Sequence, residues 1–460
     1  MATLWSGRFD TAPNGAALEF GSSFRFDRLL FEDDVTGSVA WARALAACGV
    51  LSRDDARQIE HTLTEILERG RSDPTFVDGP DEDVHSFVER LLVERLGDAG
   101  RRLHTGRSRN EQVSLDLRLY LMRRIPLLQR AVADAAAALA AQASSAGDAL
   151  MPAFTHFRPA QPVLVAHFFL AHVAPLRRDY ERLAAARAEA DALPLGSGAV
   201  AGTSYPIDVE ALARDLGFSR IVANSIDASS DRDFAASFLY ASAMTMVHLS
   251  RLAEDLIILC GDEYRFFELS DALSTGSSMM PQKKNPDPLE LVRGKSGRAI
   301  GHLMALLTTI KGLPSGYNKD LQEDKQAVFD AEDTLARCLA AVRWVVDGLT
   351  LNRDRTESAA SGLLLATDVA DYLVGRGLPF RRAHEIVAGL VRKLVAEGRA
   401  FGSLSLEEWR AASDLFDTDI VSRVTARVSV GAKRTPQSTS PQAVAAALGE
   451  VRQWLAGVAG

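Results

Sequence analysis

The sequence predicts an all-α protein of three helical domains, the central one a bundle of five long helices. The length of 460 residues corresponds to about three domains of ordinary size. Strand signals are scarce, whereas apolar residues recur every three or four positions along most of the chain, as in helices. These patterns are long in the middle of the chain and short at its ends, which predicts domains at 1–106, 107–356 and 357–460.

The two end domains are predicted from short helices with clear start signals. Ser52 is followed three positions on by Asp55, a spacing typical of a helix whose first hydroxyl accepts a backbone N–H. Ser405 and Glu408 have the spacing of a capping box. We therefore expect a small helical domain at each end of the chain.

The central domain is predicted from five long helical patterns. They cover residues 113–143, 162–190, 234–260, 288–313 and 325–349. In the third pattern even the faces between the apolar positions are only weakly polar, as in a helix that other helices surround. Five such segments with little strand between them indicate a helical bundle.

Composition and charge exclude several classes of partner and compartment. With 52 Lys and Arg against 60 Asp and Glu, the net charge of −8 gives no general attraction to nucleic acid or to anionic lipid. The uncharged stretches 159–176 and 234–250 contain Pro, His or Ser, so we predict buried helices and no membrane span. No secretory signal is visible, and three widely spaced cysteines favour thiols in a reducing cytoplasm.

Residues 101–112 (RRLHTGRSRNEQ) form the first of three polar segments that suggest chemistry. Four arginines could indicate nucleic acid, but no aromatic residues are interleaved with them. A solvated helix start is the plain alternative. Binding of a small anion is the more specific interpretation, because a Thr-Gly-Arg-Ser turn before a helix offers backbone N–H groups and guanidinium groups.

The second polar segment is 155–162 (THFRPAQP), which we expect to join a loop to a helix. Thr155 and His156 are either a helix cap with an ordinary histidine or a site of acid–base chemistry, since histidine titrates near neutral pH.

The third segment, 274–287 (STGSSMMPQKKNPD), cannot be a regular helix. It is either a mobile surface loop or a site in which two lysines and Asn285 hold a carboxylate while backbone donors support a serine oxygen. Downstream, 316–325 (GYNKDLQEDK) adds further polar side chains.

Other motifs are missing or weak. Residues 196–201 (GSGAVA) fit a dinucleotide-binding pattern, but Pro194 precedes them and no βαβ unit surrounds them. The chain has no Walker A, H-E-x-x-H or G-x-S-x-G motif. We therefore expect neither a cofactor nor a catalytic metal.

The third segment resembles the signature of the fumarase/aspartase superfamily, whose members eliminate fumarate from succinyl compounds, and its Q-K-K-N-P-D run resembles the argininosuccinate lyase family in particular. Further motifs follow this family in order along the chain. They are LWSGRF (4–9), EDVHSFVE (82–89), HTGRSRNEQV (104–113), THFRPAQP (155–162), AGTSYPID (201–208), NSIDASSDRDF (224–234) and GLPSGYNKDLQEDK (312–325).

The resemblance implies an L-aspartase-like fold and a homotetramer in which three subunits contribute to each active site. It implies the substrate argininosuccinate, the products arginine and fumarate, and no cofactor. It makes Ser277 the general base, His156 a second acid–base group, and Lys283 the cation that stabilises the carbanion. The implied substrate contacts are Ser23, Asn110, Thr155, Asn285, Tyr317, Gln322 and Lys325. His85 and His104 lie in family motifs without an implied role.

Three departures from the family pattern accompany the resemblance. Phe157, Arg158 and Pro159 stand where the family usually has Leu-Gln-Arg, Ser315-Gly316 replaces a bulkier pair, and Val209 stands where Arg is common. Rival interpretations are adenylosuccinate lyase, aspartase or fumarase activity, and an inactive structural descendant such as a lens crystallin. The Q-K-K-N-P-D and Y-N-K-D-x-Q-E-D-K motifs disfavour the three other enzymes, and the presence of every matched catalytic position disfavours the inactive descendant.

Overall fold

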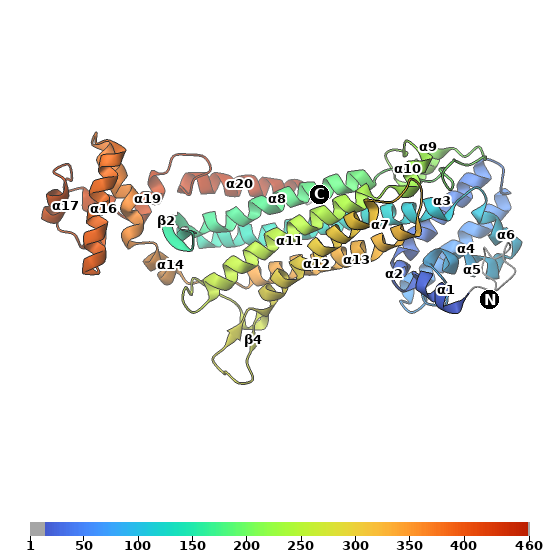
Figure 1. The fold of residues 1–460 in the computed structure, drawn as a ribbon, viewed down its shortest axis with the longest axis horizontal. Helices are drawn as coiled ribbons and strands as arrows, with labels where there is room; N and C mark the ends of the chain where they lie inside the picture. Colours follow the sequence, from blue (N-terminus) through green and yellow to red (C-terminus); the bar gives the residue numbers. More distant parts are fainter. Residues whose placement is uncertain (1–13, 459–460) are drawn as a thin grey trace. The chain divides into compact units, whose positions relative to one another are not determined.

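A computed structural model describes residues 14–458 and confirms the all-α class (Figure 1). The motif at 4–9 lies outside the described residues. The helices are α1 (Gly15–Gly21), α2 (Phe24–Asp27), α3 (Phe31–Ala47), α4 (Arg53–Ser72), α5 (Val84–Leu96), α6 (Asp98–Arg101), α7 (Arg109–Ala146), α8 (Val165–Ala190), α9 (Val209–Leu216), α10 (Ser225–Ser230), α11 (Asp233–Cys260), α12 (Asp287–Ile310), α13 (Asp324–Asp347), α14 (Arg353–Ala359), α15 (Ala366–Gly375), α16 (Phe380–Glu397), α17 (Leu406–Ala412), α18 (Ile420–Arg423), α19 (Ala426–Ala432) and α20 (Pro441–Val458). The strands are β1 (Leu150–Thr155), β2 (Arg158–Leu164), β3 (Phe267–Glu268), β4 (Thr275–Gly276), β5 (Lys284–Asn285) and β6 (Thr350–Leu351).

All five long helical patterns are present, as α7, α8, α11, α12 and α13. Their ends differ from the predicted ranges by up to four residues, and one difference has a structural cause: α8 begins at Val165, not at residue 162, because 158–164 pairs with 150–155 as an antiparallel hairpin. The expected loop-to-helix junction at 155–162 is therefore wrong. Pro159 and Pro162 lack the N–H that a helix interior requires, whereas an isolated two-stranded hairpin tolerates them at its edges.

The chain divides into two compact units, and each of the five long helices contributes residues to both. Unit 1 contains the described residues up to Gln129, together with Glu181–Ala243 and Arg298–Thr334. Unit 2 contains Arg130–Tyr180, Met244–Gly297 and the described residues from Leu335 onward. The predicted division into three domains stays a prediction.

In unit 1, helices α3, α4 and α5 enclose an apolar core. The Ser52 hydroxyl accepts the backbone N–H of Asp55 at 3.0 Å, which confirms the predicted start of α4. Trp41 is fully buried, and its indole N–H donates to the carbonyl of Thr105 at 3.1 Å. This bond ties the polar turn before α7 to the core.

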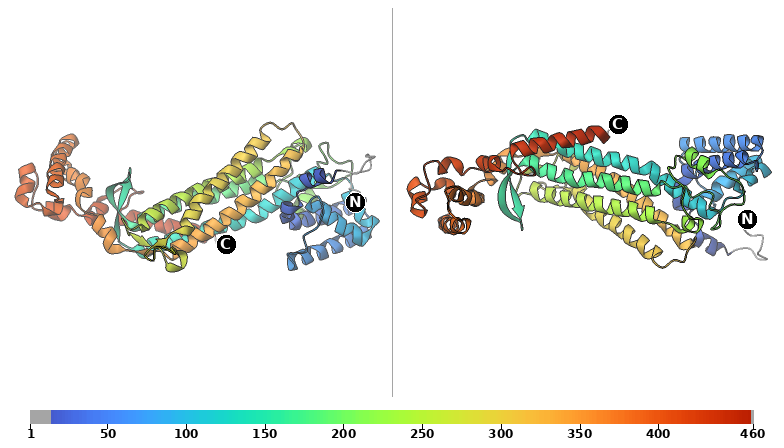
Figure 2. Two further views of the ribbon diagram at one scale, coloured as in Figure 1. Left: turned by 60° about the horizontal axis from the view of Figure 1, so that its bottom comes forward. Right: turned by 90° about the horizontal axis from the view of Figure 1, so that it is seen from above.

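In unit 2, the C-terminal helices have a core of their own around Trp409, Phe401 and Phe416. The predicted capping box is formed: the Ser405 hydroxyl accepts the N–H of Glu408 at 3.2 Å, and the Glu408 carboxylate accepts the N–H of Ser405 at 3.0 Å. The β1–β2 hairpin (teal) projects from the helices of this unit in both views of Figure 2.

Within residues 14–458, none of the helices combines the length and the apolar character that crossing a bilayer requires.

Candidate active site

The predicted site residues divide evenly between the two units. Unit 1 holds Ser23, Asn110, Tyr317, Gln322 and Lys325, and unit 2 holds Thr155, His156, Ser277, Lys283 and Asn285. Within unit 2, His156 lies on the β1–β2 hairpin and Ser277 on the β4–β5 hairpin, and Figure 1 shows these two hairpins well apart. The described chain does not bring these two groups together.

Ser277 follows β4 directly, in a loop closed by pairing of Gly276 with Lys284. Its hydroxyl oxygen accepts two backbone N–H groups, from Met279 at 3.3 Å and from Met280 at 3.1 Å. Backbone donors aimed at one oxygen favour negative charge on it. The loop thus supplies the electrostatic support that an alkoxide at Ser277 needs.

The two neighbouring lysines of this hairpin have different surroundings. Lys284 forms ion pairs with Asp271 at 2.8 Å and Glu268 at 3.4 Å, and hydrogen bonding to Asp271 raises its pKa. Lys283 is exposed and has no ion-pair partner among the residues that the structure describes. Lys284 therefore anchors the hairpin, while Lys283 is available to an anionic ligand.

His156 and Phe157 form the two-residue turn of the β1–β2 hairpin. Both have positive φ, 53° and 57°, the backbone of a type I′ turn that normally takes Asn or Gly. Each bulky residue in this conformation costs roughly 1–2 kcal/mol. Phe157 is 74% exposed, so its own packing offsets little of that cost. Strain retained at an exposed tip points to a functional role there.

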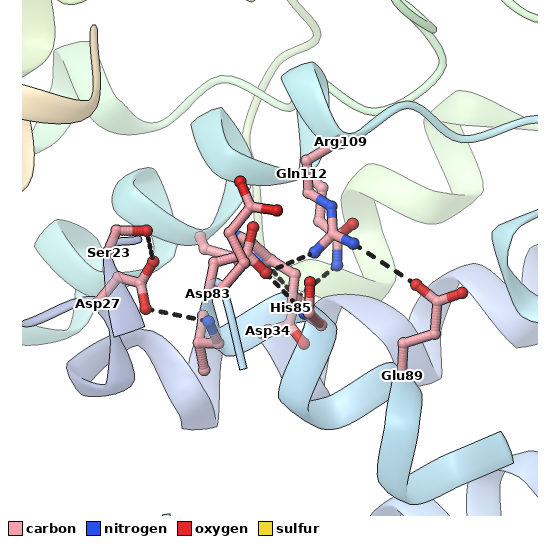
Figure 3. A network of polar contacts seen from close by, with 12 residues as sticks. Ser23, Asp27, Asp34, Asp83, His85, Glu89, Arg109 and Gln112 are labelled. Carbon is pink, nitrogen blue, oxygen red and sulfur yellow. Dashed lines mark hydrogen bonds and ion pairs between the residues drawn. The ribbon is translucent and has the colours of Figure 1, made fainter. Parts of the chain in front are cut away.

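In unit 1, three separate segments meet around Ser23. The Ser23 N–H donates to the carbonyl of Glu82 at 2.8 Å, and its hydroxyl donates to the Asp27 carboxylate (Figure 3). The Gln322 side chain donates to the carbonyl of Gly21 at 3.2 Å, and Lys319 pairs with Glu82 at 3.1 Å. These contacts bring the predicted Ser23 and Gln322 to one place.

Lys325 and Tyr317 flank a buried ionic group. Burial alone raises the pKa of Asp324, but Lys325, at 3.0 Å, and Arg232 outweigh that effect, so this pKa lies below its usual value. Burial raises the pKa of Tyr317 to about 12, so its hydroxyl keeps its proton as a hydrogen-bond donor.

Asn110 is the second residue of α7, and hydrogen bonds to the next residue, Glu111, hold the first turn of this helix in place. The Glu111 carboxylate accepts the N–H of Ser108 at 2.9 Å and the N–H of Gly198 at 3.0 Å. Burial raises the pKa of Glu111 to about 7. Gly198 belongs to the GSGAVA segment, which here serves as a structural loop against α7.

A buried polar network behind this turn was not predicted (Figure 3). His85 Nδ1 lies 2.8 Å from Asp34 and 3.2 Å from Asp116, and Gln112 donates to Asp34 at 2.5 Å. Burial raises the pKa of both carboxyls, well above the usual value at Asp116. Asp116 lies between the apolar residues Leu115 and Leu117, and a carboxylate in such a position is a sequence signal that could have revealed the network.

The three groups Asp34, His85 and Asp116 have ligand atoms within 4.8 Å of one another, as a metal site would require. However, Arg107 is buried in the same pocket and faces both carboxyls, so a cation is already present. We interpret the network as a polar core that joins α3, α5 and α7. The network gives His85 a structural role, which the sequence alone did not indicate.

Asp27 gives unit 1 a testable pH dependence. Burial raises the pKa of this carboxyl to about 6, despite the opposing hydrogen bond from Ser23. Because the native state then binds the proton more tightly than the unfolded chain, stability should fall as pH rises from about 4 through 6. A shift of about two pKa units corresponds to roughly 3 kcal/mol.

Asp27→Asn keeps the shape and can still accept the Val84 N–H, which now donates to Asp27 at 3.0 Å. We expect the melting temperature of this variant to fall less between pH 5 and pH 8 than that of the wild type, as followed by circular dichroism. Asp78→Asn, at an exposed carboxylate of the same unit, is the control. Parallel curves for Asp27→Asn and wild type would contradict the assignment.

Comparison with known proteins decides the family. The sequence model of the family described as Lyase matches residues 7–301, and that described as Argininosuccinate lyase C-terminal matches residues 363–431. Argininosuccinate lyase of Moorella thermoacetica is 48% identical over 459 residues, 99% of this chain and 98% of its own. The chain belongs to the argininosuccinate lyase family. The relative from Roseiflexus sp. (strain RS-1) is 47% identical over 98% of this chain and 99% of its own.

Solved structures of the superfamily share the fold. EDDS lyase in complex with formate has a TM-score of 0.84 and 26% identity, covering 98% of this chain and 93% of that chain. A fumarate lyase from Mesorhizobium sp. has a TM-score of 0.77 at 20% identity, over 95% and 100% of the two chains. As a member of the argininosuccinate lyase family, the chain is a carbon–nitrogen lyase.

Proposed function

We propose that this enzyme is an argininosuccinate lyase, which eliminates arginine from argininosuccinate and releases fumarate. The observation that carries the proposal is near-full-length similarity, at 48% identity, to a relative of that name. The polar segments support it, because Ser277 has backbone donors and Lys283 is unpaired among the described residues. We further propose a role in arginine biosynthesis in the cytoplasm, without a cofactor or a catalytic metal.

The chemical difficulty is the removal of a weakly acidic C–H proton next to a carboxylate. The electron pair left behind places a second negative charge on that carboxylate, which becomes an aci-carboxylate. Only groups that bind this dianion more tightly than the substrate lower the barrier. Lys283, with Asn285 beside it, is the cation proposed for this position, and such a donor is worth about 3 kcal/mol in the transition state.

Ser277 is the proposed general base. A serine hydroxyl is a poor base at its ordinary pKa, so its alkoxide needs donors and a site that excludes water. The N–H groups of Met279 and Met280 supply the donors. Closure of the hairpin over the substrate would supply the dry site. The proton passes from carbon to Ser277, the C–N bond breaks, and the departing guanidino nitrogen accepts a proton with help from His156.

We propose that the active site is shared by three subunits of a homotetramer. The support is that His156 and Ser277 lie on hairpins that are apart in this chain (Figure 1). Helix α12 also exposes large apolar side chains, and a subunit interface would remove these from water. They are Leu291, Ile300, Met304 and Leu307, which are 42–59% exposed.

His156→Asn separates the chemical role of this residue from its structural role. Asparagine tolerates positive φ better than histidine, so we expect an unchanged or higher melting temperature. Loss of an acid–base group should lower the turnover number by about 10²-fold or more. Fumarate release from argininosuccinate measures the first effect and thermal denaturation the second. An active variant would remove His156 from the mechanism.

A substrate panel tests the proposed function. The protein is incubated separately with argininosuccinate, adenylosuccinate, aspartate and malate, and fumarate is followed by its ultraviolet absorbance. We expect fumarate from argininosuccinate. Fumarate from one of the other three instead would assign a sibling activity, and fumarate from none would favour an inactive, structural protein.

A further inference from the structure

Arg158 is the first residue of β2 and pairs directly with Thr155 across the hairpin. Side chains that face each other in this way lie on the same face of a sheet, with Cβ atoms about 5 Å apart. A ligand that reaches the Thr155 hydroxyl is therefore within reach of the Arg158 guanidinium. The two residues belong to one hairpin, so this holds whatever the quaternary structure.

The opposite face of the hairpin is occupied by aromatic packing. Phe154, which pairs with Pro159, packs against Tyr264 at a ring distance of 5.5 Å and against Phe266 at 6.4 Å. Side chains alternate between the faces of a strand, so the next pair points away from this cluster. Thr155 and Arg158 are accordingly both exposed.

The charge of Arg158 is not used within the described part of the chain. Between residues 14 and 458 its guanidinium has neither an ion pair nor a hydrogen bond, and the 155–162 segment contains no acidic residue. Several other arginines of unit 2 are paired, for example Arg265 with Asp262 at 2.9 Å and Arg353 with Glu357 at 2.9 Å. An exposed guanidinium without a partner is suited to a carboxylate, which it can bind through two parallel hydrogen bonds.

The backbone holds this pair in a fixed arrangement. The turn between Thr155 and Arg158 has only two residues, both at positive φ, and the strand register shifts at Ala153/Phe154. Such bulges redirect side chains and occur often beside active sites. The short turn fixes the backbone of Arg158 relative to that of Thr155.

We propose that Arg158 is a specificity-determining residue, whose guanidinium binds the substrate carboxylate that lies beside the Thr155 hydroxyl. The inference rests on the proposed function, since Thr155 is a substrate contact only if the chain is a lyase of this substrate class. Arg158 then selects for a substrate that carries a carboxylate at this position. It does so by binding the carboxylate in the ground state and the transition state alike, so it acts on KM more than on kcat.

The test compares Arg158→Gln and Arg158→Lys with wild type in steady-state assays of fumarate release from argininosuccinate. We expect Arg158→Gln to raise KM by about tenfold or more, the range for one charge-assisted hydrogen bond, with kcat within about threefold of wild type. Arg158→Lys keeps the charge but not the paired geometry, so its KM should be intermediate. Arg392→Gln, at an exposed arginine of α16, is the matched control and should leave KM unchanged.

Two outcomes would overturn the inference, and they differ from a failure of the proposed function. A KM for Arg158→Gln within twofold of wild type, or a fall in kcat with KM unchanged, would show that Arg158 does not bind the substrate. A wild-type enzyme that releases no fumarate from argininosuccinate would overturn the proposed function and, with it, this inference. Calorimetry with argininosuccinate in the Ser277→Ala background, where the substrate is not consumed, measures binding directly. Adding Arg158→Gln to that background should weaken binding if Arg158 holds the substrate carboxylate.

Discussion

Ser277→Ala is expected to lower the turnover number by at least about 10³-fold while substrate binding remains nearly unchanged. Alanine cannot accept the proton from the substrate carbon. Among the described residues, the lost hydroxyl makes two hydrogen bonds, with the N–H groups of Met279 and Met280, so the hairpin should keep its shape. Turnover is measured by fumarate release, and binding by calorimetry with argininosuccinate.

The neighbouring serine provides a matched control for this variant. Ser278 lies in the same exposed loop, and its side chain has no hydrogen bond within residues 14–458. Ser278→Ala should therefore keep near-wild-type turnover. If Ser277→Ala retained more than about a tenth of wild-type turnover, Ser277 could not be the general base, since loss of such a group costs 10²-fold or more.

Lys283→Met is expected to lower turnover by about 10²- to 10³-fold and to weaken binding of fumarate at the same time. Methionine has a similar length but no charge, so the aci-carboxylate would lose the cation that stabilises its second negative charge. In the proposed mechanism the same lysine also holds a carboxylate of the bound product, so the inhibition constant of fumarate should rise. Both effects can be measured in one steady-state inhibition experiment.

Lys284→Met tests whether the two neighbouring lysines have different roles. Lys284 pairs with Asp271 and Glu268, so its loss should loosen the base of the hairpin without removing a ligand of the substrate. We expect a modest fall in turnover, of severalfold at most, because exposed ion pairs contribute about 1 kcal/mol or less. Equal losses in the two variants would contradict the distinct roles of Lys283 and Lys284.

The long helices could be predicted because their signal is local. Periodic apolar residues identified all five, and capping spacings identified the starts of α4 and α17, since these patterns depend on residues within a few turns of each other. The third polar segment could likewise be singled out, because glycine and proline exclude a helix there. The pairing that makes it a hairpin, Thr275 with Asn285, could not be predicted.

The features that could not be predicted from the sequence depend on contacts between residues that are distant in the chain. The β1–β2 hairpin lacks the usual Asn-Gly turn, so His156 and Phe157 gave no hairpin signal. The buried network around His85 joins residues up to about 80 positions apart, and neither Asp34 nor Asp116 lies near His85 in the chain. The difference between Lys283 and Lys284 arises from acidic partners on β3 and the following turn.

The net charge of −8 at first argues against a substrate with several carboxylates. The local distribution explains how such a substrate could bind. Lys283 and Arg158 are cations without ion-pair partners among the described residues, on two exposed hairpins, whereas most acidic residues lie on helices and in ion pairs. Subunits that each contribute a hairpin would gather positive charge at one place on an acidic protein.

Co-expression of Ser277→Ala with His156→Asn tests the central claim most directly, namely that argininosuccinate is cleaved at a site to which different subunits contribute. Each variant alone should be nearly inactive. In tetramers that mix the two at random, about a quarter of the sites should combine an intact Ser277 with an intact His156 from different chains. We predict recovery of fumarate release from argininosuccinate to roughly that fraction of wild type. Mixed tetramers that stay as inactive as the separate variants would contradict the shared site.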